Sequence, residues 1–75
     1  MKKLYKAETN AMTMFFVEDW DTNTAICVDW DLSEEEEKEL IVSFEAGTLD
    51  EEANGGERKP IEEAYEGTFG KQLLS

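Results

Sequence analysis

The chain of 75 residues contains one cysteine and no histidine, and this scarcity most constrains how it can fold. Cys27 cannot form an intramolecular disulfide bond, and the residues that build structural zinc sites are missing. A chain this short has room for one hydrophobic core, so we expect a single domain over residues 1–75. Its stability must come from apolar packing, with dimerisation as a further source.

The composition supplies enough apolar material for such a core. Apolar residues make up 40% of the chain and aromatic residues 11%, which is typical of a folded domain and not of an acidic disordered tail. The start of the chain is basic but lacks an apolar stretch of signal-peptide length. No segment approaches the roughly 18–20 apolar residues of a membrane span. We therefore expect a cytoplasmic protein without a membrane partner.

Residues 12–32 alternate in a way that predicts two strands joined by a tight turn at residues 21–24, all good turn formers. If Trp20 faces Ala25 across the turn, one apolar face is formed by Phe15, Val17, Ile26, Val28, Trp30 and Leu32. The opposite face carries Met12, Met14, Phe16, Trp20, Glu18, Cys27, Asp29 and Asp31. That second face is either covered by the chain ends or open to a partner.

A helix is predicted to begin after Ser33, because a serine followed three residues later by Glu36 forms a capping box. Gly47 is placed to end this helix in a left-handed conformation. Leu40, Ile41 and Phe44 then share the face that packs on the sheet. The opposite face of the helix is lined by Glu35, Glu36, Glu39 and Ser43.

Weaker signals flank these elements. Residues 2–8 read as a third strand, and Pro60 at a first helical position predicts a short second helix ending before Gly67. The apolar tail at residues 69–74 either enters the core or mediates self-association. We therefore expect an α+β fold, with a two- or three-stranded antiparallel sheet packed on one main helix and a short second helix near the C-terminus.

The sequence offers little support for catalysis. Without histidine, a general base near neutral pH would have to be a buried carboxylate or Cys27. Cys27 lies among acids that would raise its pKa, so a packing role is favoured over a nucleophilic one. No glycine-rich phosphate loop is present. We expect a protein that is not an enzyme and that binds no cofactor.

One segment imitates the opening of a calcium-binding loop. Asp19, Asp21 and Asn23 alternate at the spacing of the first ligands of an EF-hand. The required glycine at the sixth position is Thr24, however, and the required glutamate at the twelfth position is Trp30. We interpret the segment as a turn and predict no metal site.

The acidic excess is the main indication of function. Nineteen acidic residues against seven basic ones give a net charge of −12, which repels nucleic acid and anionic lipid and attracts cationic surfaces. Carboxylates at about the phosphate spacing of DNA can occupy a basic groove, and an exposed tryptophan would anchor them. The candidate partner-binding residues are Glu18, Asp19, Trp20, Asp21, Asp29, Asp31, Glu35, Glu36 and Glu39. A solvated acidic face that only confers solubility is the competing interpretation.

In its small size, strong acidity, α+β pattern and lack of catalytic residues, the whole chain resembles the DNA-mimic inhibitors of phages and mobile elements, namely the anti-CRISPR and anti-restriction proteins. The resemblance carries no diagnostic motif. It implies inhibition of a nuclease or a nucleic-acid-binding complex by occupation of its basic cleft, without direct contact to nucleic acid.

The alternative is a small accessory interaction module with no inhibitory role. One example is a small homodimer that pairs through strand edges or through the tail at residues 69–74. A mimic should lose its partner steeply as salt rises, whereas an apolar dimer should not.

The incomplete calcium loop leads to a first prediction. Thermal unfolding curves recorded with excess calcium and with chelator should coincide, because the segment from Asp19 lacks the glycine and the glutamate that complete the site. A rise in melting temperature of several degrees with calcium would contradict this expectation.

Overall fold

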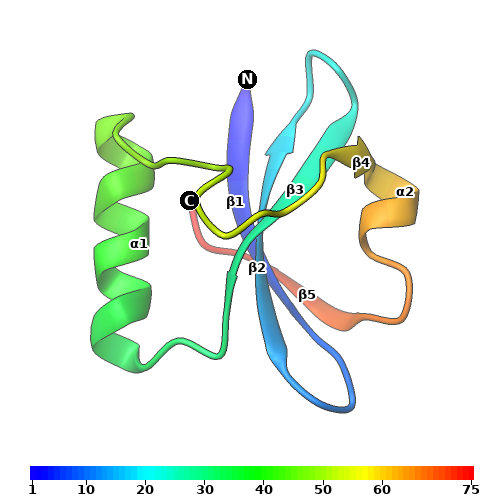
Figure 1. Cartoon of the computed structure of the whole chain (residues 1–75), viewed down its shortest axis with the longest axis horizontal. Helices are drawn as coiled ribbons and strands as arrows, with labels where there is room; N and C mark the ends of the chain where they lie inside the picture. The colour runs from blue at the N-terminus through cyan, green and yellow to red at the C-terminus, as the bar shows by residue number, and fades with distance from the viewer.

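The computed structural model describes all residues from 1 to 75 and shows an α+β fold built on a five-stranded antiparallel sheet (Figure 1). The strand order is β4-β3-β2-β1-β5. The elements in chain order are β1 (Lys2–Glu8), β2 (Thr13–Asp19), β3 (Thr24–Trp30), α1 (Glu34–Ala46), β4 (Lys59–Pro60), α2 (Ile61–Ala64) and β5 (Phe69–Leu73). None of the helices is long and apolar enough to cross a membrane.

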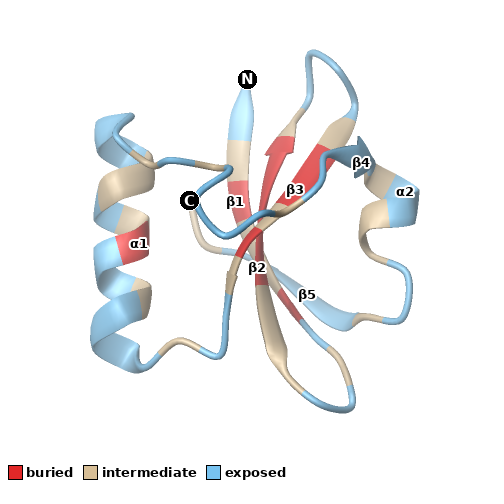
Figure 2. Ribbon diagram, in the orientation of Figure 1, coloured by how far each residue is buried: buried red, intermediate tan, exposed pale blue.

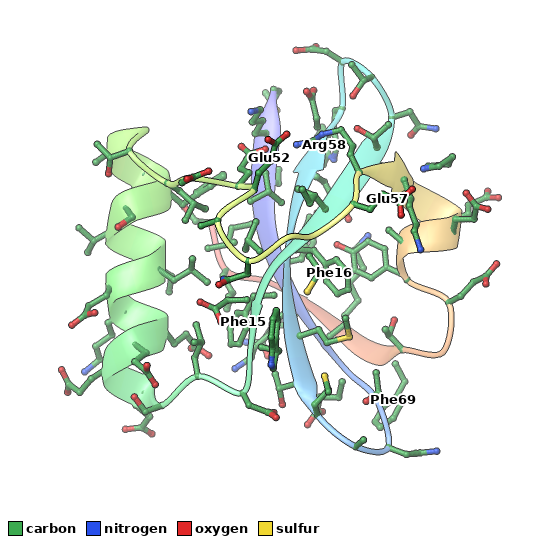
Figure 3. The ribbon with its side chains drawn as sticks, in the orientation of Figure 1. Phe15, Phe16, Glu52, Glu57, Arg58 and Phe69 are labelled. Atoms are coloured by element: carbon green, nitrogen blue, oxygen red, sulfur yellow. The ribbon has the colours of Figure 1, made fainter.

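The two faces of the sheet are covered by different segments. Helix α1 lies against one face, and α2 with the turn after it lies on the other (Figure 1). The buried residues concentrate in the three central strands (Figure 2). Figure 3 shows Phe15 and Phe16 pointing to opposite sides of β2, so both faces of this strand contribute to the interior.

The main core lies between the sheet and α1. It contains Leu4, Phe15, Val17, Ile26, Val28 and Leu40, with Leu32, Ile41, Phe44, Leu49 and Leu74 packed at its margin. This confirms that Phe15, Val17, Ile26 and Val28 share one apolar face. Leu40 is the one fully buried residue of α1, which is why the helix depends on this side chain for docking.

Both ends of α1 form as the sequence predicts. The Ser33 hydroxyl accepts a hydrogen bond from the Glu36 amide at 3.2 Å, and the Glu36 carboxylate accepts one from the Ser33 amide at 3.0 Å. Gly47 takes the left-handed conformation with φ 74°, and its amide donates to the Phe44 carbonyl. Four glutamates in the first turn complement the positive end of the helix dipole.

The register of the central hairpin differs from the prediction. Glu18, and not Trp20, lies opposite Ala25, so the turn spans residues 20–23. Asn23 adopts φ 56° there, which asparagine tolerates, and the Asp19 carboxylate accepts a hydrogen bond from the Asp21 amide at 3.0 Å. This shift by two residues leaves each side chain on its expected face, because strands alternate with a period of two.

A β-bulge then reverses two assignments, those of Trp30 and of Asp29, which lies opposite Phe15 and lines a groove with Leu40 of α1. The pairing changes register between Phe15 and Phe16, and Trp30 comes to lie opposite Met14. A one-residue slip moves a side chain to the other face of a sheet. Trp30 is consequently 44% exposed and outside the core, so the prediction that placed it on the apolar face was wrong.

The sheet has five strands, and the prediction of two or three was too few. The segment at residues 2–8 pairs along the whole of β2, as expected. The apolar tail forms β5 beside β1, and the short β4 pairs with the start of β3. Leu74 enters the core, whereas Phe69 and Leu73 remain exposed. The predicted second helix is present as α2, with Pro60 at its N-cap.

The docking of α1 leads to a second prediction. Leu40→Ala should lower the free energy of unfolding by about 2–5 kcal/mol, because the side chain is 7% exposed and its loss leaves a cavity against the sheet. Chemical denaturation followed by circular dichroism measures this change. Val42→Ala on the 64% exposed face is the matched control and should stay within about 0.5 kcal/mol of the wild type. Equal losses for both variants would contradict the orientation of the helix.

Candidate functional site

The structure divides the predicted partner-binding residues into one buried residue and two surface groups, in which all are exposed except the half-buried Asp19 and Asp29. The hairpin-tip group, Asp19, Trp20 and Asp21, lies where β2 turns into β3. The β3–α1 group consists of Asp29, Asp31, Glu35, Glu36 and Glu39. Because β3 runs between them, the two groups lie at opposite ends of the molecule (Figure 1). They do not form the single continuous surface that a linear reading of the sequence favours.

Glu18 does not belong to the exposed surface. It is 2% exposed and lies on the face of the sheet that α2 covers, where Lys71 of the edge strand β5 reaches it. Its Oε1 accepts a hydrogen bond from Trp20 Nε1 at 2.9 Å, and Lys71 Nζ lies 2.5 Å from its Oε2. Lys71 approaches as an ion pair and not as a well-aligned hydrogen bond. The assignment of Glu18 to partner binding therefore needs correction, because its charge is neutralised within the fold.

Two tyrosines enclose this ion pair. The Lys71 ammonium lies 4.5 Å from the ring centroids of both Tyr5 and Tyr65, close enough for two cation–π interactions. The Tyr65 ring also packs on Phe16, with their centroids 4.4 Å apart. This cluster fastens β5 and the turn after α2 to the centre of the sheet. Of the two alternatives for the second face of the hairpin, cover by the chain ends and opening to a partner, the first holds at Phe16 and Glu18.

The cluster shifts the pKa of two groups in opposite directions. Burial alone would raise the pKa of Glu18, but Lys71, Trp20 and Tyr65 together outweigh burial and lower it below its ordinary value. The pKa of Tyr65 is raised, first by burial and then by the neighbouring carboxylate. The Tyr65 hydroxyl is itself buried without a partner at full hydrogen-bond geometry. At neutral pH the cluster therefore contains a charged Glu18, a charged Lys71 and a neutral Tyr65.

The hairpin-tip group is partly occupied by interactions within the chain. Asp21 Oδ2 accepts a hydrogen bond from the Met1 amino group at 2.6 Å, and the Trp20 amide donates to the Met1 carbonyl. Trp20 is 49% exposed, with its indole nitrogen held by Glu18. About half of this tryptophan therefore remains open to solvent, next in sequence to Asp19.

The β3–α1 group surrounds a groove between the end of β3 and helix α1. The groove has a volume of about 190 Å³ and is lined by Asp29, Leu32, Glu36, Glu39, Leu40, Ser43 and Leu49. Its leucines supply an apolar floor, and three carboxylates lie around it. Residues from a strand, a helix and two loops meet here, so only the folded chain creates this arrangement.

Two members of the group also support the fold. Asp31 adopts φ 51°, and its Oδ1 accepts a hydrogen bond from the Thr13 amide at 3.0 Å. Glu36 completes the capping box, and the hydrogen bond from the Ser33 backbone lowers its pKa. Both carboxylates are still exposed to solvent. The other members make no comparable hydrogen bond to a distant part of the backbone or to a helix cap. They are Asp29, Glu35 and Glu39, and Asp29 accepts a hydrogen bond only from the amide of the next residue.

Most of the acidic side chains have no cationic partner. Four of the 19 form ion pairs, and fifteen do not. The pairs join Asp21 to the N-terminal amine, Glu51 to Lys2 and Arg58, Glu37 to Lys6, and Glu18 to Lys71. Four of the seven basic residues are consumed in this way, so the remaining surface is almost uniformly negative.

Cys27 occupies a small cavity on the face covered by α2. The cavity has a volume of about 150 Å³ and is lined by Met14, Phe16, Cys27, Glu57, Lys59 and Ala64. Burial, with a contribution from the charge of Asp29, raises the pKa of the thiol, which agrees with a packing residue and not with a nucleophile. No group of three or more potential metal ligands is present in the structure.

Sequence reasoning missed Lys71, Tyr5 and Tyr65 as members of the buried cluster. Lys71 lies in a segment without strand alternation, and no local pattern connects it with Glu18. A weak signal did exist, since a glutamate between Val17 and Trp20 on a mostly apolar strand needs a cation when it is buried.

A comparison of the chain with protein-family models, with curated proteins and with solved structures finds no match.

The ion pair between the buried Glu18 and Lys71, whose side chain is 41% exposed, leads to a third prediction. Glu18→Gln should lower the free energy of unfolding by about 1–3 kcal/mol at neutral pH, because it removes the partner of Lys71 inside the fold. The folded-state pKa of Glu18 lies below the ordinary value of 4.5, so its stabilisation is complete above that pH and is lost as the pH falls through the folded pKa. Denaturation at a series of pH values should therefore show the difference between variant and wild type shrinking below about pH 4.5.

A matched control removes one negative charge from the surface. Glu35→Gln should change the stability by less than about 0.5 kcal/mol at neutral pH, since Glu35 is exposed and forms no ion pair. A Glu18→Gln protein as stable as this control would show that the ion pair does not hold β5 in place.

Proposed function

We propose that the chain is an acidic binding protein that occupies a basic, nucleic-acid-binding surface of a partner protein and thereby inhibits it. The observation that carries this proposal is the groove of the β3–α1 group, where Asp29, Glu36 and Glu39 surround a floor of leucines. No catalytic step is assigned to any residue. The proposed activity is binding through the protein surface, and it involves no chemical reaction in a pocket.

The groove matches the chemistry of a long cationic side chain. Lysine and arginine carry apolar stems that pack on hydrophobic surface while their charged heads stay in a polar environment. Leu32, Leu40 and Leu49 offer that surface, and Asp29, Glu36 and Glu39 offer the acceptors. An arginine head would be favoured over a lysine head, because its planar fork binds carboxylates through two hydrogen bonds.

The unpaired acids around the groove would assist the encounter. Fifteen carboxylates without cationic partners lie on a domain measuring 29 × 26 × 22 Å, so a negative field surrounds the groove. Complementary fields steer association and raise its rate, and salt screens them. The same field repels nucleic acid, which makes a protein the fitting partner.

The hairpin-tip group would contribute a second, separate contact. Trp20 is half exposed and flanked by Asp19, and tryptophan is the residue type most often found at the centre of protein interfaces. A partner that reaches both groups has to extend along β3. A nucleic-acid-binding cleft, with basic residues spread along its length, meets that requirement.

The fourth prediction tests the β3–α1 group by charge reversal. The double variant Glu35→Lys, Glu39→Lys should bind the partner captured from the source cells at least about tenfold more weakly at low salt, because each reversal replaces attraction by repulsion. Its affinity should also depend less on salt than that of the wild type. Isothermal titration at two salt concentrations measures both effects, and circular dichroism confirms folding.

The matched control is Glu62→Lys, Glu63→Lys in α2, which makes the same charge change on the other side of the sheet. This control should keep most of the affinity and lose only the part due to overall charge. A competition assay completes the test, because the wild type should displace labelled DNA or RNA from the partner. Equal affinity of both double variants, or binding without displacement of nucleic acid, would contradict the proposal.

A further inference from the structure

The two edge strands of the sheet differ in how far other segments of the chain cover them. At one edge β4 pairs only with Thr24 and Ala25, and the loop at residues 54–56 covers the next part of β3. Asn54 Nδ2 donates a hydrogen bond to the Val28 carbonyl at 2.6 Å. Gly56 lies so close to the Cys27 carbonyl that no side chain would fit at this position. This edge is blocked over most of its length.

The other edge is open. β5 pairs with β1 on one side and has no strand on its other side. All five of its residues are exposed, and Phe69 and Leu73 are 55% and 54% exposed. Figure 3 shows Phe69 at the outer end of the strand, away from the core. An open edge with exposed apolar side chains is a template for pairing with another strand.

The charge distribution singles out the same edge. Residues 67–75 contain no acidic side chain in a chain that has nineteen. Lys71, the one charged residue of β5, is neutralised by Glu18. Two copies with a net charge of −12 each repel one another, and this edge is the exposed segment where their close approach adds the least repulsion.

We propose that a second copy of this chain pairs with β5, strand to strand and antiparallel, to form a dimer with a continuous ten-stranded sheet. The twofold axis passes near Lys71, so the Phe69 end of one copy lies beside the Leu73 end of the other. Phe69 and Leu73 lie on opposite faces of the sheet, because they pair with Glu8 and Tyr5 of β1. Each copy therefore adds Phe69 to one face of the joined sheet and Leu73 to the other. The inference stands independently of the proposed function, because it uses neither the hairpin-tip group nor the β3–α1 group.

The geometry also limits the assembly. Because the β4 edge is blocked, each copy has one edge to offer, and pairing closes at two copies without forming a filament. Gly70, with φ 64°, forms a bulge opposite β1 and shortens the regular part of the edge. The ladder is therefore short, and the apolar contacts of Phe69 and Leu73 decide the strength of the dimer.

The fifth prediction concerns the oligomeric state. Sedimentation equilibrium of the wild type should show the mass rising from 8.6 kDa to twice that value as concentration rises. The double variant Phe69→Lys, Leu73→Lys should dimerise at least about tenfold more weakly, because its edge loses the apolar contacts. The variant Phe69→Gln, Leu73→Gln keeps the net charge of the wild type and should weaken the dimer as well, so the loss is assigned to the apolar contacts. Val42→Lys, at the exposed apolar position of α1, should dimerise as the wild type does.

The salt dependence of dimerisation and the hydrogen exchange of the β5 amides test which surface forms the dimer. Raising the salt concentration should strengthen the dimer, because screening removes repulsion between like-charged copies. This is opposite to the effect expected for a basic partner. Hydrogen exchange of β5 amides should slow with rising concentration in the wild type and remain unchanged in the double edge variant.

Each result decides the proposal. A wild type that stays monomeric at concentrations on the order of millimolar in high salt overturns it. A dimer whose β5 amides exchange at the monomer rate overturns the edge assignment. The variant Glu35→Lys, Glu39→Lys should still dimerise, so failure of partner binding and failure of dimerisation are distinguishable.

Discussion

The structure depends on how a short chain covers both faces of its sheet. Helix α1 covers one face by ordinary apolar packing, but the second face is closed by four residues of α2, a turn and β5. The ion pair of Glu18 with Lys71, enclosed by Tyr5 and Tyr65, fastens these segments. A buried carboxylate is costly without a cation, and a single exposed strand is weak without an anchor. Lys71 offsets the cost of burying Glu18, and Glu18 anchors the strand that carries Lys71. The chain therefore closes its interior without a disulfide bond or a zinc ion.

The helix and the apolar face of the hairpin were predictable because their signals are local. Ser33, Glu36 and Gly47 define the ends of α1 within a few residues, and alternation assigns Phe15 and Val17 to one face. The details that depend on three-dimensional context were not. The turn shifted because Asn23 accepts a positive φ, Trp30 moved to the other face through a bulge, and Lys71 met Glu18 from the far end of the sequence. The same contact explains why Glu18 alone of the candidate acids is buried.

The acidic residues have different structural roles, and the sequence alone does not distinguish these roles. Glu36 caps a helix, Asp31 holds the Thr13 amide, and Asp21 binds the N-terminal amine. Glu35 has only the dipole of the first helical turn to offset its repulsion, and Glu39 makes no contact of this kind. This contrast separates acids retained by the fold from acids available to a partner. It also shows why charge-reversal experiments should spare Asp31 and Glu36, whose loss would disturb the backbone they hold.

The hydrogen bond from the Trp20 indole to Glu18 gives the molecule an internal optical reporter. Indole emission responds to the charge and the solvent next to the ring nitrogen. At this position those properties are set by the Glu18 carboxylate, which also forms the ion pair with Lys71. A chain whose other tryptophan, Trp30, is replaced by phenylalanine would emit from this one site. Its fluorescence would follow the attachment of the C-terminal strand in real time and without a label in solutions of the purified protein.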